Sequence, residues 1–217
     1  MKINEEKTKQ MIFNFTNNFQ FSTRTFINGK NIEIIDQTKL LGVVITNDLK
    51  WEENTSVILK KANARMQLLR KCATFTKDKS ELTNIYILFI RSILEQSCVV
   101  WHSSLNKEDS DNLERIQKSA VKVILQEDYS EYTDGLHQLK LESLYNRRMS
   151  LCKNFAQETS KHEKLKHMFP KNEIVLTNIT RKPERIKVNR AFTERYKNSA
   201  IPQMQRMLNE SDNNEET

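Results

Sequence analysis

Histidines and cysteines are the side chains of this sequence that most readily hold a metal ion, but their spacing does not assemble a site. His162 and His167 are five residues apart, which would place them on different faces of a helix. Structural zinc sites also use closely spaced pairs of cysteines, whereas Cys72, Cys98 and Cys152 are widely separated. The sequence therefore predicts no metal site.

Phosphate-binding loops need several glycines close together, because backbone N–H groups must approach the phosphates. The sequence has three glycines, Gly29, Gly42 and Gly135, and they are too far apart for such a loop. Nucleotide-binding sites of the Walker and Rossmann kinds are therefore excluded, and no small-molecule substrate is expected.

Carboxylates and single histidines are the remaining candidates for catalysis. Two carboxylate pairs flank a predicted helix, where capping and solvation explain them: Asp109 with Asp111, and Glu127 with Asp128. Asp36 and Asp48 fall at predicted strand ends and are interpreted as turn residues. His102 and His137 stand alone, and packing in a core or at a surface is the commoner role of such a histidine. No complete catalytic site is predicted.

The elements that must position any functional side chain are predicted to be mostly helical. Only three glycines and three prolines occur among 217 residues, whereas good helix formers are plentiful. The exception is the segment 1–52, which is predicted to be mainly β. The expected fold class is therefore α+β, mostly α, with short N-terminal strands followed by a helical bundle over residues 53–160.

Two apolar runs in the N-terminal segment are predicted to be strands. In residues 11–15 the apolar side chains Met11, Phe13 and Phe15 alternate, as they do in a half-buried strand. Residues 40–45 form a continuous apolar run with Gly42 inside it, where a β-bulge or a close backbone approach is expected.

A β-hairpin is predicted between these two runs. Residues 24–27 and 31–35 are strand-like and are separated by Asn28-Gly29. This dipeptide tolerates the positive φ angles of a type I′ turn, which is the tightest connection between antiparallel strands.

A basic, amphipathic helix is predicted after Trp51. Ile58, Ala62, Met66 and Leu69 recur at helical spacing and should face a core. The cations of this helix fall on the remaining surface: Lys60, Lys61, Arg65, Arg70 and Lys71. A solvated face and a polyanion-binding face are both consistent with this pattern.

Three further helices follow. Residues 79–101 are apolar nearly all round and are predicted to form one buried helix at the centre of the domain. The next helix is expected to begin at an N-cap Ser110. Its apolar stripe comprises Leu113, Ile116, Ala120, Val123 and Ile124, and its outer face carries Arg115, Lys118 and Lys122. Residues 143–156 are predicted to form the fourth helix.

The C-terminal part is predicted to be less regular. Residues 161–208 are a basic region with weak amphipathic character, and residues 209–217 are polar and acidic enough to be disordered.

The charge balance favours a polyanionic partner. Lys and Arg number 35 against 28 Asp and Glu, which gives a formal charge of +7. The odd number of cysteines and the polar N-terminus, without an apolar signal core, are typical of an intracellular protein, cytoplasmic or nuclear. No run approaches the roughly 20 apolar residues that span a bilayer, and no membrane partner is expected.

A set of short motifs occurs in a fixed order along the chain. The N-terminal motifs are Asn4-Glu-Glu-Lys7-Thr8, Lys39-Leu-Leu41-Gly42-Val43 and Asp48-Leu49-Lys-Trp51. The downstream ones include Lys60-Lys61-Ala62, Tyr86, Ile90-Arg91, Val100-Trp101, Leu113-Glu114-Arg115-Ile116-Gln117 and Arg147-Arg148. The C-terminal ones are Arg195-Tyr196-Lys197-Asn198-Ser199, Ile201-Pro202 and Met207-Leu208-Asn209. In their order and spacing, which cover nearly the whole chain, these motifs resemble the end of the palm, the thumb and the following region of reverse transcriptases from non-LTR (LINE-type, jockey-like) retrotransposons.

The resemblance implies a role for each matching residue. Lys7 matches the lysine of an Asn-x-x-Lys-Thr motif beside the polymerase site, where a cation stabilises departing pyrophosphate; a solvated lysine at a strand end is the alternative. Lys39, Leu41 and Gly42 match the primer grip, where a tight backbone turn holds the primer end, and a simple bulge is the alternative. The basic helix matches the first thumb helix, which tracks template and primer through their phosphates.

The resemblance also implies what is missing. In that family the aspartates that bind Mg²⁺ lie upstream of the Asn-x-x-Lys-Thr motif, and the histidine that commonly follows the tryptophan is Asn54 here. The chain is therefore expected to be a truncated copy, or a gene model begun at an internal methionine. It is expected to be non-catalytic, without a cofactor, and to bind RNA, DNA or their hybrid without sequence preference. A helical protein-interaction or structural module with incidental basic charge is the competing hypothesis.

Overall fold

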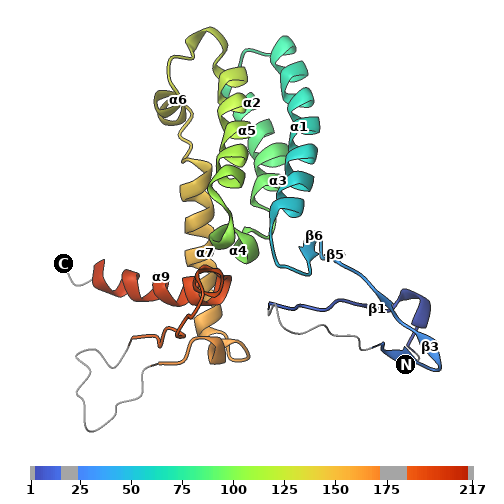
Figure 1. Ribbon diagram of the computed structural model, residues 1–217. Helices are drawn as coiled ribbons and strands as arrows, with labels where there is room; N and C mark the ends of the chain where they lie inside the picture. The colour runs from blue at the N-terminus through green and yellow to red at the C-terminus, as the bar shows by residue number, and fades with distance from the viewer. Residues whose placement is uncertain (1–2, 16–23, 172–184, 215–217) are drawn as a thin grey trace. The chain divides into compact units, whose positions relative to one another are not determined.

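The computed structural model of the chain describes residues 3–15, 24–171 and 185–214. Its contacts divide the chain into two compact units, Met1–Val57 and Ile58–Thr217. The first unit contains short strands and the second is helical, so the protein is mostly helical with a few short strands, as predicted (Figure 1).

Three separate pairs of short strands lie in the described residues of the N-terminal unit, before its first long helix. After the one-turn helix η1 (Glu5–Lys7), β1 (Lys9–Gln10) runs parallel to β4 (Glu33–Ile34). The other two pairs are antiparallel: β2 (Phe26–Ile27) with β3 (Lys30–Asn31), and β5 (Gln37–Leu40) with β6 (Val43–Thr46).

The predicted Asn-Gly hairpin is confirmed. Asn28 and Gly29 have φ angles of 49° and 79°, and the strands on either side pair in the register Ile27 with Lys30. Two positive φ angles in succession define the tight turn that matches the twist of antiparallel strands.

The strand predicted over residues 11–15 is wrong. The observed strand is the preceding β1, and residues 11–15 have no regular structure. Phe13 and Phe15 are 46% and 55% exposed, so neither side chain packs into a core. Alternating apolar residues form a strand when one face of a sheet is buried, and an isolated pair of two-residue strands has no such face.

The single strand predicted over residues 40–45 is also wrong, because the chain reverses direction in the middle of the run. Leu41 and Gly42 have φ angles of 48° and 91°, and they form the two-residue turn between β5 and β6. Gly42 adopts this φ at no steric cost. The expected bulge is therefore a hairpin turn, and Leu41 at its tip is 90% exposed.

Helix α1 (Glu52–Phe75) has the predicted stripe and the predicted surface. Ile58, Ala62, Met66 and Leu69 are all buried. Asn54, in the first turn, is buried as well, and its Oδ1 accepts a hydrogen bond of 3.1 Å from the backbone N–H of Val44 in β6.

The helix predicted over residues 79–101 is interrupted. The segment comprises α2 (Lys79–Ile85), a π-helical turn η2 (Tyr86–Arg91), α3 (Ser92–Glu95) and α4 (Cys98–Trp101). Ser97 has a φ of 54°, which ends α3 before α4 begins.

Burial in this segment is confined to one side, so the prediction of a helix buried all round is wrong. Residues at every fourth position are buried: Leu82, Tyr86, Ile90, Leu94 and Cys98. By contrast Leu88 is 66% exposed and Phe89 45%. A four-residue repeat drifts by about 40° at each step around an α-helix, and a π turn, which holds more residues, offsets part of that drift.

Helix α5 (Lys107–Leu125) is the central helix of the second unit, since it contacts α2, α6 (Tyr132–Gln138) and α7 (Leu144–Lys161) (Figure 1). The predicted N-cap Ser110 is wrong, because Asn106 caps this helix by accepting a 2.7 Å hydrogen bond from Asp109 N–H. Ser143 caps α7, which extends past the predicted end to Lys161.

The C-terminal region is more regular than predicted. It contains α8 (Glu194–Lys197) and α9 (Ala200–Asn214), so residues 209–214 are helical rather than disordered. Ala156 of α7, Phe169, Met204 and Leu208 form a buried cluster between α7 and α9. Asn209 also binds both backbone groups of Ile186, at 2.9 Å each. Within the described ranges, no helix is long and apolar enough to cross a membrane.

Candidate nucleic-acid interface

Lys7 lies at the end of η1, immediately before β1. Its backbone N–H donates to the side chain of Asn4 at 3.2 Å, and its ammonium group is exposed. The asparagine of the Asn-x-x-Lys-Thr pattern thus caps the turn that carries the lysine, and Thr8 Oγ1 donates to the carbonyl of Asn4 at 2.7 Å. This turn presents Lys7 to solvent without a carboxylate partner in the described part of the chain.

Lys39, Leu41 and Gly42 lie at the tip of the β5–β6 hairpin. Lys39 is exposed and pairs with Val44 across the ribbon, while Leu41 and Gly42 form the turn itself. The hairpin therefore has a tight backbone turn with the exposed Leu41 side chain at its tip and the Lys39 cation on the adjoining strand.

The five cations of α1 are all exposed. Lys60 and Lys71 lie almost one above the other, because eleven residues make about three turns of an α-helix. Lys61 and Arg65 lie on one flank of that line, and Arg70 lies on the other flank. Four of the five cations therefore share one side of the helix.

The charge of this face is not compensated. After Glu52 and Glu53 in the first turn, α1 contains no acidic residue. No ion pair involves its five cations among the residues that the structure describes. Several other cations are paired, for example Lys79 with Asp128 at 2.5 Å and Arg147 with Glu95 at 3.3 Å. The α1 cations therefore form a positively charged face without an acidic partner in the described part of the chain.

The outer cations of α5 are exposed as predicted, but they are engaged. Lys122 lies over the Tyr129 ring at 5.2 Å and Lys118 over the Tyr132 ring at 6.0 Å. Arg115 donates to Asn112 at 2.7 Å. These contacts fix the cations in place and distinguish them from the α1 set.

No protein-family model, no curated protein and no solved structure matches this chain.

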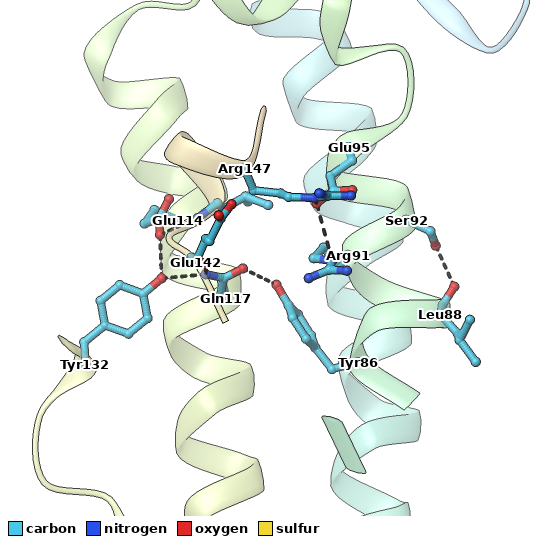
Figure 2. Close-up of polar contacts among 11 residues, drawn as sticks. Tyr86, Leu88, Arg91, Ser92, Glu95, Glu114, Gln117, Tyr132, Glu142 and Arg147 are labelled. Carbon is cyan, nitrogen blue, oxygen red and sulfur yellow. Dashed lines mark hydrogen bonds and ion pairs between the residues drawn. The ribbon is translucent and has the colours of Figure 1, made fainter. Parts of the chain in front are cut away.

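A buried polar network connects the helices of the second unit, and the sequence pattern did not reveal it. Tyr86 donates to Gln117 at 2.5 Å, and Gln117 donates to Tyr132 Oη and to the carbonyl of Glu142 (Figure 2). Tyr132 in turn donates to Glu114. Burial raises the pKa of the Tyr86 and Tyr132 hydroxyls, so both remain protonated donors.

The neighbouring residues Arg147 and Arg148 make different contacts, one with Glu95 and the other in the core. Glu95 accepts from Arg91 at 3.4 Å and from Arg147 at 3.3 Å, which ties α3 to the start of α7 (Figure 2). Arg148 points into the core instead, where its Nε donates to His102 Nδ1 at 3.2 Å and its guanidinium lies 5.8 Å from the Trp101 ring centre. In the sequence, the feature that pointed to this buried arginine was its position within the apolar stripe of α7.

His102 is neutral in the folded protein. Burial, and then the neighbouring Arg148, lower its pKa from 6.5 to about 4. Since Nδ1 accepts from Arg148, the proton of the neutral ring is on Nε2.

Acidification is therefore expected to destabilise the fold. Unfolded His102 takes up a proton near pH 6.5 and folded His102 only near pH 4, so the unfolded state binds more protons between these values. This contribution to stability is complete above about pH 6.5 and is lost as the pH falls, with a loss of about 2 kcal/mol from about pH 7 to 5. Urea unfolding at both pH values should show this loss, and His102→Gln should remove most of it. An equal loss in the variant would contradict the assignment.

The cysteines are free thiols. Cys98 and Cys152, far apart in sequence, meet between α4 and α7, where Cys152 Sγ lies 3.9 Å from the carbonyl oxygen of Cys98. In the described part of the chain, no group of three or more His, Cys, Asp or Glu side chains is placed to hold a metal ion.

Proposed function

We propose that this chain is the palm end and thumb-like part of a LINE-type reverse transcriptase and that it binds RNA, DNA or their hybrid without sequence preference. The observation that supports binding is the uncompensated face of α1, where Lys60, Lys61, Arg65 and Lys71 share one side of a helix without acidic neighbours. Support for the family comes from the ordered motifs in the sequence.

Contacts from this face would be to phosphates. Lysine and arginine side chains spaced along one side of a rigid helix can each neutralise a phosphate, which fixes orientation but reads no base. Sequence-independent binding is the expected consequence.

Salt dependence tests this proposal directly. Fluorescence anisotropy with a labelled RNA–DNA hybrid should give an affinity that falls with salt at a logarithmic slope of about −3 to −4, as four released counterions require. From about 50 to 200 mM salt this slope corresponds to a loss of about a hundredfold. Binding that is absent, or insensitive to salt, would refute the proposal.

Catalysis is not part of the proposal. The family's metal-binding aspartates have no counterpart among the motifs that this chain matches, and Lys7 alone supplies one cation for a phosphate. Primer extension with Mg²⁺ or Mn²⁺ by the pure protein would contradict this point.

The competing function is a helical protein-interaction module. Exposed apolar side chains on η2 favour it, since Leu88 is 66% exposed and Phe89 45%. Loss of nucleic-acid binding after removal of the α1 charges favours the first function, whereas a chain that never binds nucleic acid favours the second.

A further inference from the structure

A cavity of about 510 Å³ lies in the second unit, away from the face of α1. It is bordered by the 3₁₀ turn η3 (His102–Ser104), the first turn of α5, the first turns of α7 and the helix α9. Its lining includes His102, Ser103, Lys107, Ser110 and Tyr145. These residues have no part in the nucleic-acid contacts proposed above.

The buried guanidinium of Arg148 contacts two residues of this lining. Arg148 is fully buried, and it donates to His102 at 3.2 Å and to Ser110 Oγ at 3.4 Å. Both hydrogen-bond partners are uncharged, and Nη1 of the guanidinium has no hydrogen-bond partner in the described part of the chain. The carboxylates of Glu114 and Glu95 act on Arg148 through space, but no hydrogen bond joins either of them to it within the described residues. A buried guanidinium whose hydrogen bonds go only to neutral groups would stabilise a nearby anion.

The hydrogen bonds of Arg148 also set the polarity of the lining. Ser110 Oγ accepts from Arg148, which leaves its own proton for donation elsewhere. His102 Nδ1 accepts as well, which places the ring proton on Nε2. Ser103 Oγ is buried and has no partner within the described residues. Three lining groups are therefore hydrogen-bond donors.

Further positive potential comes from α5. Its N-terminus lies at the cavity, because Asn106, Lys107 and Ser110 belong to its cap and first turn. The N-terminal end of a helix of 19 residues carries a partial positive charge, and Lys107 adds a full one at the lining. Glu108 and Asp109 of the same turn are acidic, but neither belongs to the lining of the cavity. Asp111 is the acidic residue among the described residues of the lining, and it is exposed to solvent.

We propose that this cavity binds a phosphate group, with Ser103, Lys107 and Ser110 as donors and Arg148 as the buried counter-charge. A phosphate offers several acceptor oxygens to donors that come from η3 and α5, and the helix N-terminus adds to its attraction. The phosphate belongs either to a free phosphate compound or to the end of a nucleic-acid strand.

Inorganic phosphate is the probe for the site itself. Calorimetric titration of the full chain, with chloride at matched ionic strength as the reference, should show saturable binding of phosphate. Ser110→Ala and Lys107→Gln should each weaken that binding by about tenfold, as the loss of one charge-assisted or polarised hydrogen bond predicts. Lys161→Gln, at the far end of α7, is the charge-matched control for Lys107→Gln and should leave it unchanged.

Absence of saturation, or equal weakening by the control, would overturn the proposal. Unchanged binding in Ser110→Ala and Lys107→Gln would also overturn it, because the phosphate would then lie elsewhere. Lys107 is exposed and Ser110 half-buried, but Ser110 accepts from buried Arg148, so circular dichroism verifies the folding of both variants before titration.

Two oligonucleotides distinguish the sources of the phosphate. A 5′-phosphorylated strand that binds more tightly than its 5′-hydroxyl counterpart, with the difference abolished in Ser110→Ala, identifies a strand end. Equal binding of the two strands alongside saturable inorganic phosphate identifies a free phosphate compound. The 5′-hydroxyl strand has no terminal phosphate for the cavity, so its binding tests the face of α1 alone. Failure of the cavity proposal can therefore be distinguished from failure of the proposed function.

Discussion

Replacing Lys60, Lys61, Arg65 and Lys71 together with glutamine is expected to weaken binding to an RNA–DNA hybrid by about a hundredfold at low salt. The four side chains lie on one side of α1 and none has an acidic partner in the described part of the chain. Non-specific binding to nucleic acid is almost wholly electrostatic, so its salt dependence should disappear with the charges.

The quadruple variant should be as stable as the unchanged protein, although its affinity for nucleic acid is lower. All four side chains are exposed, and exposed substitutions usually change the free energy of unfolding by less than about 0.5 kcal/mol. Unaltered thermal unfolding of the quadruple variant would show that the loss of binding is local.

A second quadruple variant controls for net charge. Lys161, Lys164, Lys166 and Lys187 are exposed outside α1, and replacing them with glutamine removes the same four charges. This control should retain most of the affinity, and Arg70→Gln alone should have a small effect because Arg70 lies on the other flank of α1. Equal losses in both quadruple variants would mean that overall charge, and not the face of α1, determines binding.

Helix α1 could be predicted from sequence because its pattern is local. Four apolar residues at spacings of four, four and three define the buried stripe, and the cations fall on the surface that remains. The exposure of the candidate interface was therefore available from the sequence. The absence of ion pairs around it was not, because pairing depends on residues brought near by the fold.

The two hairpin turns show how far turn chemistry can be predicted. Asn28-Gly29 is a dipeptide that tolerates two positive φ angles, and the hairpin was predicted from it. Leu41-Gly42 adopts the same kind of turn, but a leucine with positive φ is unusual, so the apolar run around it was interpreted as one strand.

Helix α9 was missed although a signal was present. Met204, Met207 and Leu208 have helical spacing, and Pro202 in the first turn is compatible with a helix start. The polar composition after Asn209 favoured disorder instead. The apolar face of α9 packs against α7, and this tertiary contact stabilises the helix. Such a contact cannot be predicted from the composition of the segment.

Many of the downstream motif residues turned out to be internal. Tyr86, Gln117 and Glu114 form the buried network, and Trp101 and Arg148 pack together in the core. Their long-range pairing could not be predicted from periodicity, since the partners lie on different helices. These residues explain how the helical unit holds together, whereas the cations of α1 are exposed and take no part in that packing.

Glu114 has the largest expected effect on stability within that network. Its carboxylate accepts from Tyr132 Oη and from the backbone N–H groups of Leu144 and Tyr145, each of the latter at 3.0 Å. It therefore joins α5 to α6 and caps the N-terminus of α7 at the same time, and a carboxylate is favoured at that end of a helix.

Glu114→Ala is expected to lower the free energy of unfolding by about 3 kcal/mol, because it leaves the Tyr132 hydroxyl and two helix N–H groups without their acceptor. Glu114→Gln keeps one acceptor oxygen and should lose about half as much. Urea denaturation measures both, and Glu158→Ala, an exposed carboxylate on α7, is the control with little expected change. A loss below about 1 kcal/mol in Glu114→Ala would mean that Ser143 caps α7 without help and that the network contributes little to stability.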